Sequence, residues 1–183
     1  NNYLSSALGS LFNLGTFEHD DWLCALPLFH IGGLSILIRS VIYGTCFTLT
    51  RGFVVDEVAR LVEHKGVTLA SLVPTMLTRI LEHRPRISPG SLRAVLLGGG
   101  PASDSLVERA LLAGFPVLQT YGMTEACSQL ATMPPGHELD KLGSAGLPLL
   151  RARIEIRDED GQAVPTNESG QIWAAGPMVM DGY

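Results

Sequence analysis

Hydrophobic residues recur along the first 135 positions in two patterns that alternate with each other. Short, continuous apolar runs are typical of buried strands, whereas apolar residues spaced three or four positions apart are typical of one helix face. The continuous runs predict strands at residues 22–26, 46–49, 68–73, 92–97 and 116–120. The spaced patterns predict helices at residues 3–14, 31–41, 56–64, 75–82 and 103–113. This alternation favours an α/β fold in which helices cover a parallel sheet.

The pattern changes after about residue 135. Residues 153–157 alternate charged and apolar side chains, as in a strand with one face in water. An acidic turn at residues 158–161 separates this segment from a second strand-like run at 170–175. We therefore expect an α/β subdomain over residues 1–135 and the start of a small, antiparallel β-rich subdomain over residues 136–183.

The longest apolar stretch, residues 22–43, invites comparison with a membrane helix. Pro27, His30, a glycine pair and Arg39 interrupt it, whereas a spanning helix needs about 20 predominantly apolar residues. We expect a buried strand, a turn and a buried helix here, and no transmembrane segment.

Composition narrows the class of protein. With 183 residues, 46% of them hydrophobic, the chain can form one domain or a large part of one. Its net charge of −5 disfavours nucleic acid and anionic membranes as partners. The three cysteines (Cys24, Cys46 and Cys127) form no C-x-x-C pair, which gives no support for a zinc site or a disulfide framework. A reduced, cytoplasmic setting fits best, and association into homo-oligomers stays open.

Three consecutive glycines beginning at Gly98 stand between a predicted strand and a predicted helix. A dinucleotide-binding fingerprint would need glycine where Ser103 stands, and no acidic residue follows about 20 positions later to hold a ribose. Two interpretations remain. The glycines either form a tight strand-to-helix turn, or they provide a backbone floor that a planar ring can approach closely. The N-terminus of the following helix would favour an anion at the same edge.

Residues 117–126 begin as an apolar run, and we expect the strand to break at Gly122 into a turn that presents Thr124 and Glu125. Polar side chains at the carboxyl end of a strand suit a ligand site in an α/β sheet, although they can also simply turn the chain. His30 stands alone in an apolar run beside two glycines, which fits either a core histidine or a working imidazole.

Six segments occur in a fixed order: L-P-L-F-H, V-P-T-M-L, L-L-G-G-G-P-A, Q-T-Y-G-M-T-E, K-L-G-S-A-G-L-P-L and G-Q-I-W-A-A-G-P-M-V-M-D-G-Y. Together they resemble the adenylate-forming superfamily of acyl-CoA synthetases. Within it, A-L-P-L-F-H-I-x-G-L-S, R-S-V-I-Y-G and V-L-L-G-G-G-P-A are most similar to the o-succinylbenzoate–CoA ligases of menaquinone biosynthesis. The resemblance implies part of the large N-terminal domain of such an enzyme.

The resemblance also implies an ATP-dependent acid–thiol ligase. Such an enzyme forms an acyl-adenylate from ATP and a small-molecule carboxylate, then transfers the acyl group to coenzyme A, with Mg²⁺ as its metal. The alternatives are a ligase for fatty or aryl acids and, in a different class, a non-catalytic nucleotide-binding module. The family's pyrophosphate loop, T-G-D motif and catalytic lysine have no counterpart in these residues, so we expect a fragment that is inactive alone.

The family's nucleotide site falls on the central motifs. Adenine would lie between the backbone of the glycine turn and the ring of Tyr121, with Gln119 near its exocyclic amine. The residues implied for ATP or AMP are Gly98, Gly99, Gly100, Pro101, Gln119, Tyr121, Gly122, Met123 and Thr124. Many members carry an acidic residue where Gly100 stands, so the contact here would come from the backbone alone.

The resemblance implies three catalytic residues, Thr124, Glu125 and His30. Thr124 would hydrogen-bond the α-phosphate. Glu125 would hold Mg²⁺, which takes hard oxygen ligands. His30 would line the acyl pocket.

Polar side chains beside the turn bear on the acid substrate. Thr120, Ser128 and Gln129 would surround the acyl pocket, and a buried second carboxylate needs such hydrogen-bond partners whereas an alkyl chain does not. No arginine lies in this segment, so we expect hydroxyls or bound water to meet that carboxylate. Alternatively, these side chains only satisfy the backbone of the turn.

Overall fold

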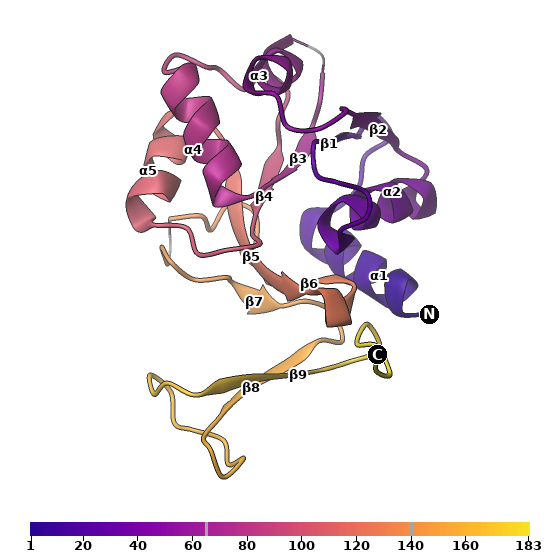
Figure 1. The fold of residues 1–183 in the computed structure, drawn as a ribbon, viewed down its shortest axis with the longest axis vertical. Coiled ribbons are helices and arrows are strands. Elements are labelled where there is room, and N and C mark those ends of the chain that lie inside the picture. The colour runs from indigo at the N-terminus through magenta and orange to yellow at the C-terminus, as the bar shows by residue number, and fades with distance from the viewer. Residues whose placement is uncertain (65, 140) are drawn as a thin grey trace.

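The computed structural model describes residues 1–64, 66–139 and 141–183. Within these ranges, seven strands form one sheet in the order β2-β1-β3-β4-β5-β6-β7 (Figure 1). Its strands are β1 (Asp21–Cys24), β2 (Cys46–Leu49), β3 (Leu69–Leu72), β4 (Ala94–Leu97), β5 (Val117–Met123), β6 (Ser128–Thr132) and β7 (Leu147–Pro148). The helices are α1 (Asn2–Leu14), α2 (Ile31–Tyr43), α3 (Val55–His64), α4 (Pro74–His83) and α5 (Asp104–Leu112).

Helices cover both faces of the sheet, with α1 and α2 on one side and α3, α4 and α5 on the other (Figure 1). Successive strand residues point to opposite faces, so Leu23 of β1 packs into the core under α3 to α5. Its neighbour Trp22 packs into the core under α1 and α2. Strands buried on both faces explain the continuous apolar runs of the sequence. Within the described residues, no helix has the length and apolar character needed to cross a bilayer.

The first five strands are parallel, which confirms the predicted helix-covered parallel sheet. Their register brings the carboxyl ends into line, because Leu72 of β3 lies opposite Leu97 of β4, which in turn lies opposite Gln119 of β5. Ligands of open α/β sheets bind at this edge.

The expected break at Gly122 is wrong, since β5 continues to Met123. Its second half pairs with the antiparallel strand β6, which the sequence analysis did not predict, and the register shifts between Tyr121 and Gly122. A Cβ atom on Gly122 would lie 1.7 Å from the carbonyl oxygen of Ser128, so glycine permits the close approach of the two backbones rather than a turn. The turn follows as a 3₁₀ helix, η1 (Thr124–Ala126).

The two predicted strands of the C-terminal part are confirmed as β8 (Arg153–Arg157) and β9 (Gln171–Ala175), an antiparallel pair separate from the large sheet (Figure 1). Met178 follows β9 and is buried against Ala126 and Leu130, so a small apolar cluster joins the chain after β9 to the η1–β6 segment. The antiparallel structure thus begins at β6, inside the large sheet, and continues in β8 and β9.

A charged cluster fixes the opposite, amino-terminal ends of the strands. Both Asp20 carboxylate oxygens accept hydrogen bonds from Arg93, at 2.8 and 2.6 Å. Thr68 also donates to Asp20 at 2.8 Å, and the Arg93 guanidinium reaches the carbonyl oxygen of Leu14 at 2.7 Å. These residues precede β1, β3 and β4 or end α1, so the cluster ties four elements together. Burial raises the pKa of Asp20, but the hydrogen bonds from Arg93, the Phe17 backbone and Thr68 outweigh it and hold the pKa below 3.8.

Replacing Asp20 by Asn should therefore lower the free energy of unfolding at pH 7 by about 2–3 kcal/mol, because Arg93 loses a charged, bidentate partner. The lowered pKa means that the carboxylate stabilises the fold above pH 3.8 and that this contribution is lost as pH falls through the folded-state pKa. Urea titrations of wild type and Asp20→Asn should converge on acidification. Glu155→Gln, which breaks the exposed pair with Arg157, is the matched control and should cost far less; an equal loss would contradict the prediction.

Candidate active site

A cavity of about 490 Å³ lies at the carboxyl edge of the parallel strands. The segments after β1, β3 and β4 line it, together with β5, β6 and the start of α2. A wider hollow of about 570 Å³ lies on the outer surface between Phe53 and His83, away from the strand ends. Position at the strand ends, rather than size, marks the first cavity as the candidate site.

The structure brings nine of the sequence-predicted site residues into the lining of this cavity. They are His30, Gly98, Gly99, Thr120, Gly122, Met123, Thr124, Ser128 and Gln129. Five others lie outside that lining: Gly100, Pro101, Gln119, Tyr121 and Glu125. The predicted acyl-pocket residues thus share one cavity, while most residues predicted for the base and the metal lie around it.

The glycine turn opens directly from β4 and presents bare backbone. A Cβ on Gly98 would lie 2.8 Å from the Thr120 carbonyl oxygen, so this glycine lets the turn pack against β5, whereas a Cβ on Gly100 would meet open space. Ser103 then caps α5 by accepting a hydrogen bond from the backbone N–H of Leu106 at 3.3 Å. The exposed stretch between Gly98 and the helix N-terminus suits a planar ring or an anion.

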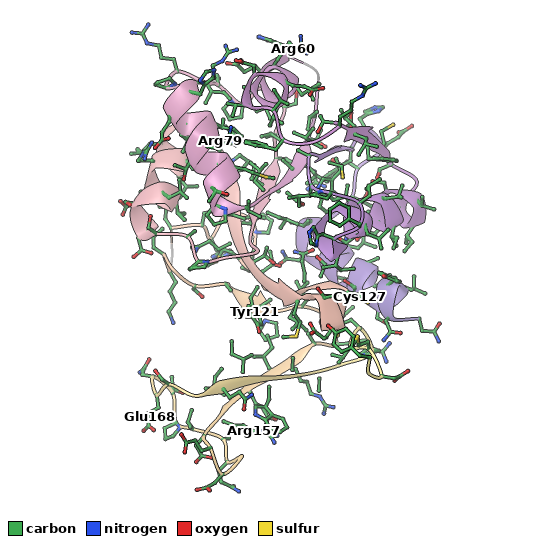
Figure 2. All side chains as sticks on the ribbon, in the orientation of Figure 1. Arg60, Arg79, Tyr121, Cys127, Arg157 and Glu168 are labelled. Carbon is green, nitrogen blue, oxygen red and sulfur yellow. The ribbon has the colours of Figure 1, made fainter. Side chains whose placement is uncertain are left out.

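Tyr121 and Gln119 alternate in direction with Thr120 along β5. The Tyr121 ring is half-buried against the apolar cluster that contains Ala126 and Met178, and Figure 2 shows it in the space between the large sheet and the two-stranded sheet. The side-chain oxygen of Gln119 accepts a hydrogen bond from the Gly143 backbone at 3.1 Å. This contact holds the K-L-G segment against the strand end.

Glu125 lies in η1 with an exposed carboxylate. Its own backbone N–H and then the Tyr183 hydroxyl, which donates to Oε1 at 2.8 Å, hold the pKa of this carboxyl below its ordinary value. The same hydrogen bond raises the pKa of Tyr183. In the described part of the chain, no three His, Cys, Asp or Glu side chains gather as a metal cluster. A cation here would therefore take Glu125 and otherwise ligand oxygens, which is how Mg²⁺ is commonly held beside phosphates.

The hydroxyls beside the cavity are already engaged with each other. Gln129 donates from Nε2 to the Thr132 hydroxyl at 2.7 Å, and that hydroxyl lies 2.8 Å from the Thr120 hydroxyl. Thr120 in turn donates to the carbonyl oxygen of Ala131 at 2.8 Å. Because Thr120 uses its hydrogen for Ala131, the Thr132 hydroxyl is the donor in its contact with Thr120, and both hydroxyl hydrogens have a protein acceptor. Thr120 lines the cavity but has no hydrogen left to donate to a substrate carboxylate.

Arg39 is the charged residue of the cavity lining that the sequence analysis did not predict. It projects from α2, is 2% exposed and lines the cavity. Burial lowers its pKa to about 10, which leaves the guanidinium charged at neutral pH. One terminal nitrogen is 3.5 Å from the Ser6 hydroxyl, and Nε has no hydrogen-bond partner among the described residues. The sequence analysis considered only the segment beside the turn, where no arginine lies, and so expected hydroxyls or bound water to meet the second carboxylate. The signal for Arg39 was a single cation inside an otherwise apolar helix.

Comparison with known proteins matches the whole chain to one enzyme family. The model of the AMP-binding enzyme family matches residues 1–183. The 2-succinylbenzoate–CoA ligase of Bacillus licheniformis is 50% identical over 182 residues, which cover 100% of this chain and 38% of that protein. The chain thus spans well under half the length of the curated relatives it matches.

Solved structures of similar proteins have the same fold as this chain. The o-succinylbenzoate coenzyme A synthetase of Bacillus subtilis, in complex with ATP and magnesium ion, is 49% identical with a TM-score of 0.92, over 100% of this chain and 38% of that one. A double mutant of the B. subtilis synthetase bound with its product analogue OSB-NCoA is 48% identical with a TM-score of 0.94, over 100% and 37% of the two chains.

The two glycines of the site should respond oppositely to alanine. Gly122→Ala forces a methyl group into the β6 backbone and should lower the free energy of unfolding by about 3 kcal/mol. Gly100→Ala places its methyl group in open space and should leave stability unchanged while it weakens nucleotide binding. Urea unfolding and calorimetric titration with AMP measure the two effects. A stable Gly122→Ala protein would disprove the steric argument.

Proposed function

The chain belongs to the AMP-binding enzyme family, and on this premise we propose that its protein is an ATP-dependent ligase that joins o-succinylbenzoate to coenzyme A in menaquinone biosynthesis. In the first step the substrate carboxylate attacks the α-phosphate of ATP, which gives an acyl-adenylate and pyrophosphate. In the second step the thiol of coenzyme A attacks the acyl carbon and AMP leaves. The ligands named for the B. subtilis relatives, ATP, magnesium and a CoA product analogue, support the same set here.

The observation that carries the choice of acid is the buried Arg39 guanidinium at the cavity wall. o-Succinylbenzoate has two carboxylates, one of which reacts while the other must be desolvated with the aryl ring. A buried carboxylate needs a charged or hydrogen-bonding partner, and a guanidinium with an unpaired N–H supplies both. A fatty-acid tunnel would instead leave this cation against an alkyl chain, which is unfavourable.

The neighbouring hydroxyls serve a different purpose in this proposal. Since Thr120 donates to Ala131 within the protein, the Thr120–Thr132–Gln129 chain shapes the pocket wall and keeps it rigid. Ser128 and His30 complete the wall towards the strand ends. Arg39 is thus the group that meets the second carboxylate, in place of the hydroxyls or water expected from the sequence.

The nucleotide would occupy the backbone floor beside this pocket. Gly98, Gly99, Gly100 and Pro101 would face the base, with Tyr121 and Gln119 at its edges, and Thr124 would donate to the α-phosphate. Mg²⁺ held by Glu125 would neutralise phosphate charge. Most of the rate acceleration would come from positioning and charge stabilisation.

A ligase for fatty or aryl acids is the nearest alternative, and a non-catalytic nucleotide-binding module is the alternative of another class. ATP–pyrophosphate exchange by the full-length protein separates the last from the first two, because only an adenylating enzyme returns labelled pyrophosphate to ATP. A reduced cytoplasmic setting is part of the proposal; it is supported by Cys24, Cys46 and Cys127, which are all free thiols.

Substrate preference tests the acid. The full-length protein should use o-succinylbenzoate with a kcat/KM that exceeds that for octanoate by up to ~10⁴-fold, since a polar pocket rejects analogues that leave it unpaired. Arg39→Gln should lower kcat/KM for o-succinylbenzoate by roughly 10²–10³-fold, but should barely change it for 4-oxo-4-phenylbutanoate, which lacks the ring carboxylate. Pyrophosphate release measures all five kcat/KM values, three for wild type and two for Arg39→Gln. Equal use of octanoate would move the assignment to a general acyl-CoA ligase.

Removing the Glu125 charge tests the metal assignment. Glu125→Gln keeps the shape of the side chain, so folding should survive while adenylation at limiting Mg²⁺ falls by roughly 10²–10³-fold, the cost of losing one electrostatic stabiliser. Thermal unfolding of the variant provides the control for the fold. Wild-type adenylation by Glu125→Gln would reduce this residue to a structural role in the turn.

A further inference from the structure

A buried cation needs a partner, and the partner of Arg39 is not a carboxylate. None of the ion pairs found among the described residues involves Arg39. Its contact with the Ser6 hydroxyl, at 3.5 Å, is at the outer limit of a hydrogen bond. An unpaired charge at 2% exposure should be strongly destabilising, so something else must hold the guanidinium.

The ring of Trp22 is in the position to do so. The guanidinium carbon of Arg39 lies 5.6 Å from the centroid of the Trp22 ring, within the range of a cation–π interaction, for which tryptophan is the best partner. Desolvation strengthens this attraction. Both side chains are almost completely buried, Trp22 at 1% and Arg39 at 2% exposure.

The ring itself is fixed by the sheet. Trp22 is in β1, where it packs with Cys24 and Ile36 under α1 and α2. Its indole N–H donates to the Ser71 hydroxyl of β3 at 3.1 Å, and Ser71 also lines the cavity. The ring is therefore held in one orientation by the paired strands β1 and β3, and it restrains the position of the guanidinium.

An aromatic ring and a carboxylate differ in how many N–H donors of the guanidinium they leave free for a ligand. A resident Asp or Glu would neutralise the cation and occupy its N–H donors in the fork geometry that a ligand carboxylate needs. The face of an aromatic ring attracts the cation through its quadrupole and carries no counter-charge. A guanidinium held in this way stays charged, stays in place, and keeps donors for an incoming anion.

We propose that Trp22 is the positioning residue of the acyl site, whose indole ring holds Arg39 charged and unpaired so that it can receive the second carboxylate of the substrate. The inference rests on the proposed function, in which Arg39 meets that carboxylate. Trp22 touches neither the substrate nor the nucleotide in this account and acts only through Arg39.

Trp22→Phe in the full-length protein tests this role, because phenylalanine keeps an aromatic core residue but weakens the cation–π contact and removes the bond to Ser71. KM for o-succinylbenzoate should rise roughly tenfold, with kcat within about twofold of wild type. KM for 4-oxo-4-phenylbutanoate should not change, nor should the Trp22→Phe change have an effect when Arg39→Gln is already present. Equal increases with both acids would show a general packing defect and overturn the proposal.

Trp173→Phe is the matched control. Trp173 also lies under an arginine, with the guanidinium carbon of Arg157 4.6 Å from the ring centroid. That pair is on the two-stranded sheet, well away from α2 (Figures 1 and 2). Trp173→Phe should leave both KM values at the wild-type level, and a rise for o-succinylbenzoate equal to that of Trp22→Phe would overturn the proposal.

A second series guards against misfolding of Trp22→Phe. Tryptophans with one to four ring fluorines, incorporated at position 22, keep the shape of the side chain while fluorine withdraws electron density from the ring face. KM for o-succinylbenzoate should rise step by step with fluorine number, and a flat series in a folded protein would overturn the proposal.

Hydrogen exchange read without substrate separates this inference from the proposed function. The Nε hydrogen of Arg39, followed by ¹⁵N NMR, should exchange with solvent at least several times faster in Trp22→Phe than in wild type. Faster exchange in a protein that does not prefer o-succinylbenzoate would defeat the proposed function while the ring–guanidinium contact stands. Unchanged exchange in a protein that does prefer this acid would overturn the positioning role alone.

Discussion

The antiparallel pairing of β6 with the second half of β5 is the constraint on which the site depends. Up to Gln119, β5 is an ordinary parallel neighbour of β4; from Thr120 onwards it pairs with β6 instead. This change of partner brings Ser128 and Gln129 to the strand edge where the glycine turn already lies. It requires two backbones to come closer than a methyl group allows at Gly122, which gives that glycine of the Y-G-M-T-E segment a packing reason.

The two ends of the parallel sheet hold an arginine in opposite ways, with Arg93 partly buried and Arg39 almost completely buried. At the amino end, Arg93 has a carboxylate, two backbone carbonyls and the Phe17 ring as partners, and the result is a clamp between elements. At the carboxyl end, Arg39 has a ring and a distant hydroxyl. An arginine whose N–H donors are all hydrogen-bonded suits a structural cluster, whereas one with an unused N–H suits a site that must accept a ligand.

Much of the fold could be predicted because its strands are buried on both faces. A run such as A-V-L-L, now β4, is apolar throughout and needs no knowledge of its neighbours. The segment S-Q-L-A-T of β6 was missed because its polar residues interrupt the apolar pattern that marks the other strands. Thr132 and Gln129 find their partner in Thr120 of β5, so the strand is recognised only once β5 and β6 are paired. The break expected at Gly122 failed for the same reason. This glycine is required by the close approach of the β6 backbone and does not turn the chain.

The residues of the candidate site also fall into those that local motifs predict and those that only the packing of the fold reveals. Motifs located the glycine turn, Thr124 and His30, because these residues lie in local segments that follow strands. They did not locate Arg39, because a helical pattern shows that a charge interrupts an apolar face but not what lies opposite it. Trp22, the residue opposite, is in a different element, and only the packing of α2 on β1 brings the two together.

Because the Arg39 guanidinium is desolvated and has no anionic partner, ligand binding and folding stability are thermodynamically coupled. The ligand-free fold carries the cost of that charge, and a ligand that supplies the missing anion removes it in addition to adding its own contacts. Through linkage, the melting temperature should then rise further with a dianionic acid than with an equally bulky monoanion at the same occupancy. If the proposed function holds, the ligand-free protein is the form most easily unfolded and degraded, and its abundance would follow the supply of the dianionic acid.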